Sequence, residues 1–364
     1  MTEDIAIYIH FLYCKSRCPY CDFFRALQPK VFDEEALVAR YLDEIRRFAE
    51  LCGKRKVKSV FFGGGTPSLL SARAVERVLA EIAGHFALKS GAEISLEANP
   101  NTFEKEKFLD FKKAGVNRLS LGVQALESAG LKFLGRTHSL DEALNAMELG
   151  AAAFDKFSID LIYARPGQTW EVWQKEIDLA LSFGLKHISL YELSIEEGTV
   201  FYKKNIEPLN EEDAAKLYEQ TVFYLRSKGV ERYEVSNFAF DEANRSVHNL
   251  TYWQGGDYIG IGEGAHGRLK THGKIYATVD GEIKEEISAL ERAEELLFMG
   301  LRVRDGIDTK RFFEVSGVPL FDFLNMKALL RLAELNLVYY DNCHIRATDK
   351  GFLVLDEIIR ELLE

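Results

Sequence analysis

Short apolar runs rich in β-branched and aromatic residues recur along the first 200 residues, with longer helix-like segments between them. This alternation is typical of strand–helix units whose strands are parallel. Six such runs occur, at residues 5–10, 58–62, 93–97, 118–123, 156–162 and 187–193. Because a closed barrel of this kind needs eight strands, six predict an α/β fold built on an incomplete (β/α)6 TIM-like barrel. A doubly wound open sheet fits the pattern alone as well.

The segments between the runs carry signals of helix ends. Residues 102–114 place Phe103, Phe108 and Phe111 near helical spacing, and Gly115 follows as a C-cap. Farther along, Ser139 with Glu142 at the fourth place has the pattern of a capping box. The sequence therefore predicts helices in the crossovers between strands.

The rhythm changes after about residue 200. Residues 210–228 read as one amphipathic helix, and 249–267 are rich in Tyr, Gly and Asn, so we expect a loop-and-strand extension packed on the barrel. Beyond residue 286, helical patterns surround a hairpin-like pair at 337–340 and 345–347, which suggests a winged-helix-like module. We thus expect the barrel in 1–200, the extension in 201–285 and the C-terminal module in 286–364.

The overall charge excludes some functions. The chain has 46 Lys and Arg against 57 Asp and Glu, a net charge of −11, so a generic nucleic-acid binder is not expected. No run approaches the about 18 apolar residues of a membrane span, and the acidic N-terminal residues lack the layout of a secretory signal. We expect a cytoplasmic protein without a transmembrane segment.

Polar or special residues follow the predicted strands at their carboxyl ends. They are the GGGTP string at 63–67, the Asn-Pro pair at 99–100, Gln124 and the PGQT string at 166–169. Ligand sites of α/β folds lie at these ends of the strands. The pattern therefore predicts one shared active face.

Three of the five cysteines, Cys14, Cys18 and Cys21, lie within eight residues directly after the first strand. In a reducing compartment such clustering indicates metal binding before it indicates a disulfide. His10 could complete a zinc site, and Cys52 or Cys343 could supply a fourth sulfur to an iron–sulfur cluster. The remaining alternative is a cluster with one iron left open for a non-protein ligand.

The CxxxCxxC spacing, with the aromatic Tyr20 before the last cysteine and the GGGTP string after the second strand, resembles the radical SAM superfamily. The resemblance implies that Cys14, Cys18 and Cys21 hold a [4Fe-4S] cluster. It also implies that the open iron chelates S-adenosylmethionine, whose reductive cleavage gives a 5′-deoxyadenosyl radical.

The strings YIHFLYC, FFGGGTPSLL, SLEANP, NRLSLGVQ, LGRTHS, FSIDLIYARPGQT and YEVSNFA are similar to the oxygen-independent coproporphyrinogen III oxidase-like subfamily. The oxidase itself carries a further cysteine two places after the third, where this chain has Phe23. Residues 248–253 read HNLTYW and fit the HNxxYW motif of the heme chaperone (HemW) branch. The resemblance therefore implies the chaperone branch.

The resemblance also implies residues that bind the cofactor. Tyr8 matches a tyrosine that contacts the cofactor near the cluster, and Tyr20 matches the aromatic that packs on adenine. Gly64, Gly65 and Thr66 match the loop that binds the methionine end.

Four further residues match the polar part of that site. Glu97 matches the acidic group that binds the amino acid portion, while Gln124, Arg136 and Asp160 match contacts to ribose and carboxylate. An Arg suits a carboxylate through its bidentate fork, and acidic groups suit a ribose diol or an ammonium.

His248 is the candidate axial ligand of heme, with Tyr252 and Trp253 against the porphyrin. The alternative is a buried, hydrogen-bonded histidine among core aromatics, and His266 is a second candidate ligand. The branch implies a heme chaperone that delivers heme to acceptor apoproteins such as membrane-bound respiratory enzymes, touching the membrane only through a partner. The other hypotheses are an oxidase that decarboxylates coproporphyrinogen III to protoporphyrinogen IX, and a structural or regulatory cluster without cofactor cleavage.

Overall fold

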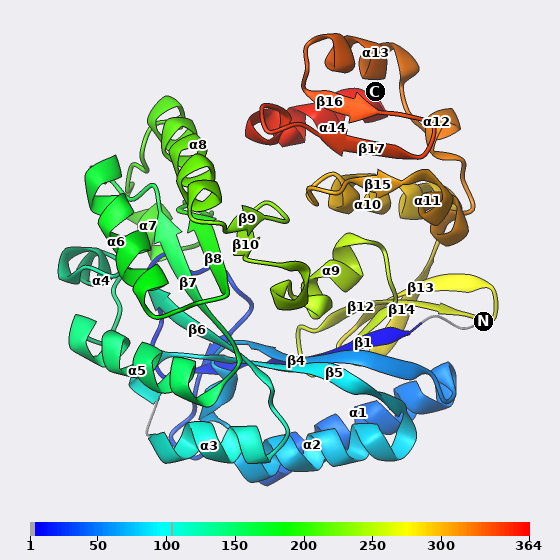
Figure 1. Cartoon of the computed structure of the whole chain (residues 1–364). Helices are drawn as coiled ribbons and strands as arrows, with labels where there is room; N and C mark the ends of the chain where they lie inside the picture. Colours follow the sequence, from blue (N-terminus) through cyan, green and yellow to red (C-terminus); the bar gives the residue numbers. More distant parts are fainter. Residues whose placement is uncertain (1–3, 103–104) are drawn as a thin grey trace.

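The computed structural model describes residues 4–102 and 105–364. Its central feature is a parallel array of six strands that correspond to the six predicted runs (Figure 1). These strands are β1 (Ile5–Phe11), β4 (Lys56–Gly64), β5 (Ala87–Ala98), β6 (Arg118–Gln124), β7 (Lys156–Tyr163) and β8 (His187–Glu192). They neighbour one another in chain order, and each pair is parallel. The prediction of an incomplete (β/α)6 barrel is confirmed.

Helices lie along the outer face of this array (Figure 1). They are α1 (Glu34–Cys52), α2 (Ala72–His85), α3 (Lys105–Lys113), α5 (Leu140–Ala153), α6 (Trp170–Ser182) and α8 (Glu211–Ser227). Two shorter helices, α4 (Ser128–Phe133) and α7 (Val200–Lys203), pack with each other and with Tyr20 of the cysteine loop. Both halves of the predicted capping box between Ser139 and Glu142 are present at the start of α5. The predicted helix at 102–114 appears as α3, although its Phe103 lies outside the described residues.

The sheet continues beyond the six strands at both edges. On one side, β10 (Asn237–Ala239) and β9 (Glu231–Arg232) follow β8. On the other side, β11 (Tyr258–Ile261) pairs in parallel with β1, and β12 (His266–Thr271), β13 (Lys274–Val279) and β14 (Glu282–Ile287) follow as an antiparallel meander. The segment expected to extend the barrel, 249–267, does so in part by adding β11 to the edge of the sheet. The free edge of β1 offers unpaired backbone groups, and β11 satisfies them.

A short helix, α9 (Val247–Trp253), packs against β4 and β1 on the side of the sheet opposite α1 and α2 (Figure 1). It carries the HNLTYW motif, and Ser246 caps it by accepting from Asn249 N. It also contacts α10 of the C-terminal module. This helix therefore lies between the barrel and the C-terminal module.

The C-terminal module has an apolar core of its own. Its elements are α10 (Ala289–Gly300), β15 (Ile307–Asp308), α11 (Thr309–Ser316), α12 (Leu320–Phe323), α13 (Met326–Glu334), β16 (Val338–Tyr340), β17 (His344–Ala347) and α14 (Leu355–Leu363). The predicted hairpin is β16 with β17, and β15 completes a three-stranded sheet. Helices around this small sheet make the module winged-helix-like, as predicted.

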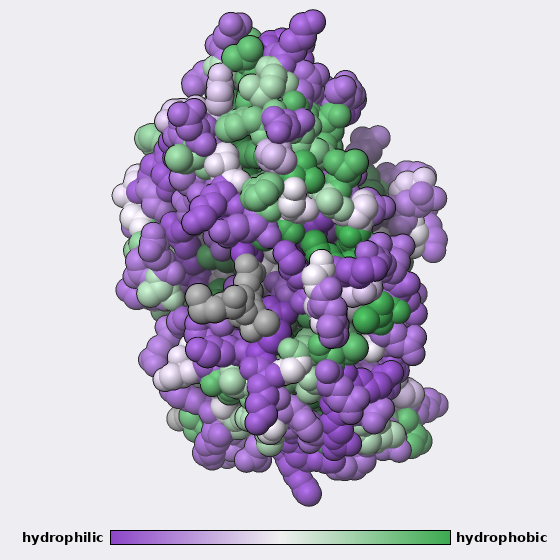
Figure 2. All heavy atoms as spheres, turned by 90° about the vertical axis from the view of Figure 1, so that its right-hand side faces the viewer, coloured by the Kyte–Doolittle hydropathy of each residue, from purple (hydrophilic) through white to green (hydrophobic). Residues whose placement is uncertain are grey.

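Hydrophobic residues gather in the upper half of the face seen in Figure 2, where the C-terminal helices lie. Exposed large apolar side chains of this module include Leu290, Phe298 and Phe313. None of the helices in residues 4–102 and 105–364 is long and apolar enough to cross a membrane.

One buried ion pair joins the start of β4 to the meander. Arg55 Nη1 lies 2.6 Å from Asp257 Oδ2, and both side chains are almost inaccessible to solvent. The same carboxylate accepts a hydrogen bond from Lys270 N at the end of β12. Because a buried charge without its partner is costly, this contact fixes the added strands to the barrel.

We therefore predict that Asp257→Ala lowers the free energy of unfolding by about 3 kcal/mol, since the buried Arg55 guanidinium would lose its carboxylate partner. Urea unfolding followed by circular dichroism measures the change. Asp43→Ala is the control, because Asp43 makes an exposed ion pair with Arg47 and should cost well under about 1 kcal/mol. Equal effects of the two substitutions would contradict the prediction.

Candidate cofactor site

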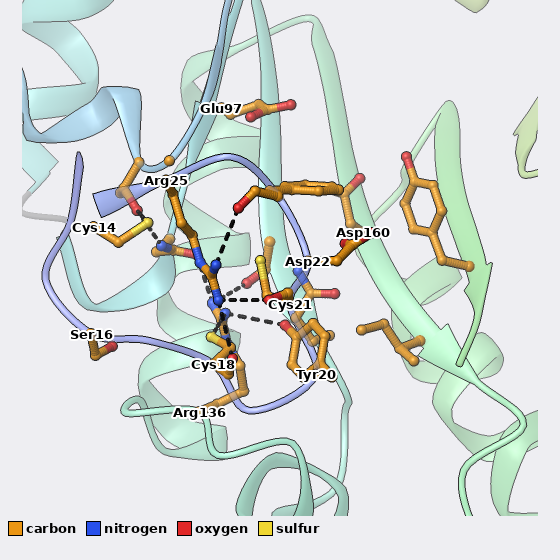
Figure 3. Close-up of a pocket in the computed structure, with 18 of the residues that line it drawn as sticks. Cys14, Ser16, Cys18, Tyr20, Cys21, Asp22, Arg25, Glu97, Arg136 and Asp160 are labelled. Atoms are coloured by element: carbon orange, nitrogen blue, oxygen red, sulfur yellow. Dashed lines mark hydrogen bonds between the residues drawn. The ribbon is translucent and has the colours of Figure 1, made fainter. Parts of the chain in front are cut away.

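A cavity of about 390 Å³ opens at the carboxyl ends of the parallel strands. Residues at or near the ends of three neighbouring strands line it, among them Gly64 of β4, Ala98 of β5 and Gln124 of β6, and Asp160 lines it from within β7. The cysteine loop closes the other side (Figure 3). The glycine loop, Asn99 and Gln124, which follow separate strands in the sequence, thus meet at one site, whereas the PGQT string at 166–169 does not line the cavity.

The cysteine loop is held in a compact turn. Its two ends pair as β2 (Tyr13–Cys14) and β3 (Ala26–Leu27). Arg25 closes the turn from inside, donating from Nη2 to the carbonyl oxygens of Cys21 at 2.8 Å and Cys18 at 3.3 Å. All three cysteines line the cavity as free thiols (Figure 3).

Hydrogen-bond donors face two of these sulfurs. Thr66 Oγ1 donates to Cys14 Sγ at 3.5 Å, and Arg136 Nη1 donates to Cys18 Sγ at 3.1 Å. Burial raises the pKa of the Cys14 and Cys21 thiols. Metal binding removes such thiol protons, and a guanidinium beside sulfur favours the thiolate that a cluster needs.

No other predicted ligand approaches these thiols. Cys52 lies on α1 and Cys343 is exposed in the C-terminal module. Both ring nitrogens of His10 are engaged, since Tyr8 OH donates to Nδ1 and Nε2 donates to the carbonyl oxygen of Phe24.

Among residues 4–102 and 105–364, no three His, Cys, Asp or Glu side chains are grouped to hold a single metal ion. The three cysteine sulfurs therefore line one cavity without meeting at a single-ion site.

The glycine loop packs directly on the strand end that leads into the cysteines. Gly65 N donates to the carbonyl oxygen of Phe11 at 2.6 Å, and Thr66 N donates to that of Tyr13 at 2.9 Å. A Cβ atom on Gly65 would lie 2.5 Å from the Tyr13 oxygen. Gly65 is thus required by close backbone packing, and the loop fixes the position of Cys14.

Two carboxyl groups face the interior of the cavity. Glu97 Oε2 accepts from Gly64 N at 3.2 Å, and Asp160 accepts from Ser120 Oγ at 3.1 Å. Burial raises the pKa of Glu97 to about 8, with a further contribution from Asp160, and burial raises the pKa of Asp160 to about 6. A cationic ligand in the cavity would lower both pKa values and so favour the ionised carboxylates.

Arg136 connects the two sides of the site. Its Nη1 donates to Cys18 Sγ, as described above, and its Nη2 donates to Asn99 Oδ1 at 2.6 Å and to the carbonyl oxygen of Gly122 at 2.9 Å. Its Nε is buried and has no hydrogen-bond partner among the described residues. An orphaned donor of this kind is satisfied by a ligand acceptor such as a carboxylate oxygen.

Apart from Tyr8 and His248, the predicted site residues all line this cavity. Gln124 adopts a positive φ of 76° there, a conformation that is rare outside glycine and common at functional sites. Several lining residues were not among the predicted site residues, and two of them, Asn99 and Arg25, hold the site together through the hydrogen bonds described above. The position of Asn99 directly after a strand was the available signal for it, whereas nothing local marked Arg25.

Comparison with known proteins identifies the family to which the chain belongs. Residues 8–180 match the radical SAM superfamily, and residues 287–354 match the HemN C-terminal domain. The chain is 35% identical to the heme chaperone HemW of Lactococcus lactis, covering 100% of this chain and 98% of the relative. The chain belongs to the HemW branch of the radical SAM superfamily.

Other relatives are similar over nearly the whole chain. HemW of Bacillus subtilis is 34% identical, with 98% of both chains covered. The mitochondrial radical S-adenosyl methionine domain-containing protein 1 of Bos taurus is 37% identical, covering 100% of this chain and 88% of the relative. The solved structure of the coproporphyrinogen III oxidase HemN from Escherichia coli has a TM-score of 0.82 at 20% identity and covers 99% of this chain and 90% of that chain, which shows a shared fold.

The histidine of the HNLTYW motif, His248, is buried. His248 is 2% exposed, its Nδ1 lies 3.1 Å from Ser59 Oγ, and its ring stacks on Phe61 with 5.0 Å between centroids. Burial lowers its pKa to about 3, so the imidazole is neutral. Tyr8 lies in the same aromatic cluster, 6.2 Å from His248 between ring centroids. The structure thus places both residues behind the cofactor cavity.

We predict that replacing Cys14, Cys18 and Cys21 together with Ala abolishes the visible iron–sulfur absorbance after anaerobic reconstitution, because all three sulfurs of the cavity are removed. Iron and sulfide analysis of the same samples gives the cluster content. Cys52→Ala and Cys343→Ala are the controls and should retain a full cluster. A full cluster in the triple variant would contradict the assignment of ligands.

Proposed function

We propose that this HemW-branch protein is a heme chaperone that holds a [4Fe-4S] cluster on Cys14, Cys18 and Cys21 and S-adenosylmethionine across the strand ends. It would pass heme to acceptor apoproteins such as respiratory enzymes. The observation that carries the proposal is the single cavity, which gathers three thiols, a glycine loop, two carboxyl groups and a guanidinium. The heme chaperone names of full-length relatives support the second half.

Each side chain of the cavity has a role in this proposal. Glu97 would bind the ammonium of the methionine portion, and Arg136 Nε would bind its carboxylate. Asp160 would accept from the ribose hydroxyls. When bound, the cluster supplies the electron for reductive cleavage of S-adenosylmethionine. The barrel contributes binding and orientation of the groups that meet there.

The choice of chaperone over oxidase rests on two positions. Phe23 stands where the oxidase carries its further cysteine, and its side chain is 61% exposed at the cavity. The HNLTYW motif of the chaperone branch forms α9. Heme transfer also requires reversible binding at a site that an acceptor can reach. Where the acceptor is membrane-bound, we infer that contact between proteins brings the chaperone to the membrane.

The test uses anaerobically reconstituted full-length protein. We expect saturable heme binding in an absorbance titration, and no porphyrin product when the protein is supplied with coproporphyrinogen III, reductant and S-adenosylmethionine. A coproporphyrinogen III oxidase run in parallel controls the assay. Decarboxylated product would make this protein an oxidase, and failure to bind heme would refute the chaperone proposal.

We further predict that affinity for S-adenosylmethionine rises with pH up to about pH 8, where half of the Glu97 side chains are ionised in the free protein. Ammonium binding needs the Glu97 carboxylate, and the pKa of this group in the free protein is about 8. Glu97→Gln should remove this pH dependence and weaken binding by about 10- to 100-fold at pH 8, the cost of a charge-assisted hydrogen bond. Calorimetry across the pH range measures both effects.

The same substitution should have the opposite effect on the unliganded protein. A raised carboxyl pKa means that stability is lost as pH rises from the ordinary value toward about 8. Glu97→Gln should therefore stabilise the free protein at pH 8 while impairing binding. Glu76→Gln, at an exposed position on α2, should change neither property. Unaltered pH dependence in Glu97→Gln would contradict the assigned role.

A further inference from the structure

Heme iron needs an imidazole that a ligand can reach, and the structure divides the eight histidines of the chain sharply. Four of them are buried, with exposed fractions of 6% or less: His10, His138, His187 and His248. The other four are exposed: His85, His266, His272 and His344. The buried rings, including that of the HNLTYW motif, are enclosed by protein atoms.

Two of the exposed histidines already have carboxylate partners. His85 Nε2 lies 3.0 Å from Glu81 Oε1, and His344 Nε2 lies 3.4 Å from Asp308 Oδ2. His272 sits in the turn between β12 and β13, with Nδ1 3.2 Å from Thr271 Oγ1. The ring of His266, at the start of β12, makes no hydrogen bond to any residue of the described part of the chain.

An exposed apolar surface follows directly on the cysteine loop. We call it the 23–31 surface, and it consists of Phe23, Phe24, Leu27 and Val31, which are 61%, 58%, 54% and 89% exposed. Large apolar side chains that are exposed so close together in a chain mark a binding surface for an apolar ligand or partner. Phe23 also lines the cofactor cavity, so this surface begins at the mouth of that cavity.

His266 lies beside this surface. The Phe24 ring packs on Gly264, two residues before His266, and a Cβ atom on Gly264 would come within 2.2 Å of Phe24 Cδ1. His10 Nε2 donates to the carbonyl oxygen of Phe24 at 3.0 Å, which fixes this aromatic residue to β1. Burial lowers the pKa of His10, whose ring centroid lies 6.3 Å from that of Phe24. An unengaged imidazole and exposed aromatic rings therefore share one neighbourhood.

We propose that heme binds on the 23–31 surface, with His266 as an axial ligand of the iron and Phe23 and Phe24 against the face of the porphyrin. This inference rests on the proposed heme chaperone function and names the site at which it operates. An aromatic surface suits the apolar macrocycle, and an exposed imidazole suits iron that must later be released. His248 would then have a structural role, through its contacts with Ser59 and Phe61 of β4.

The first test is a heme titration of the reconstituted full-length protein, followed by the heme absorbance and by electron paramagnetic resonance of the ferric complex. His266→Ala should weaken binding by at least about tenfold, because even changes beside a metal ligand cost that much, and it should change the axial-ligand signature. His272→Ala is the matched control, an exposed histidine at the other end of β12, and should bind as the parent does. The cluster absorbance should be the same in all three proteins.

The second test distinguishes the iron ligand, His266, from the aromatic residues that contact the porphyrin, Phe23 and Phe24. Metal-free protoporphyrin IX offers the same macrocycle without iron, so its affinity should fall in Phe23→Ser and Phe24→Ser and stay unchanged in His266→Ala. Phe223→Ser, which is 75% exposed on α8, is the control for loss of an exposed aromatic residue.

The outcomes separate this inference from the function on which it rests. If the parent protein binds no heme, the chaperone function itself fails. If the parent binds heme and His266→Ala keeps the same affinity and spectrum, the proposed site is overturned. A loss on His248→Ala in that case would assign the ligand to the buried motif after opening of α9.

Discussion

The site depends on two backbone hydrogen bonds, from Gly65 N to Phe11 O and from Thr66 N to Tyr13 O. They join the end of β4 to the segment that enters the cysteine loop, so the position of Cys14 relative to the sheet is set by main-chain packing. Glycine at 65 is the condition for this contact, because any side chain there would meet backbone oxygen. Thr66 then extends the contact to the sulfur of Cys14. The cysteine loop is thus held against the sheet by these hydrogen bonds as well as by the short pairing of β2 with β3.

A second constraint is that two carboxyl groups and a guanidinium are buried together in one cavity. Glu97 and Asp160 have raised pKa values because burial disfavours their ionised forms, while Arg136 keeps a buried Nε without a partner among the described residues. These features cost stability in the free protein. A ligand that carries both an ammonium and a carboxylate would remove both costs at once. Destabilisation of the empty cavity and affinity for a zwitterionic ligand therefore have one physical origin.

Helix α9 connects this chemistry to the rest of the molecule. Its histidine packs on Phe61 of β4 and hydrogen-bonds Ser59, and its neighbour Tyr252 contacts both His248 and Tyr258 of β11. The motif that distinguishes the branch is thus part of an aromatic layer between the sheet and the C-terminal module.

The sequence alone determined the strand–helix alternation, because side-chain periodicity and caps are local properties, as at Ser139 and in the apolar run of β1. It also identified the cysteines and the glycine loop, whose spacing is a chemical signature. Only the tertiary structure decided that β11 completes the edge of β1, since this pairing joins strands about 250 residues apart whose proximity no local pattern encodes. It likewise decided that His248 is enclosed while His266 is open, because the exposure of a ring depends on what the whole fold packs around it.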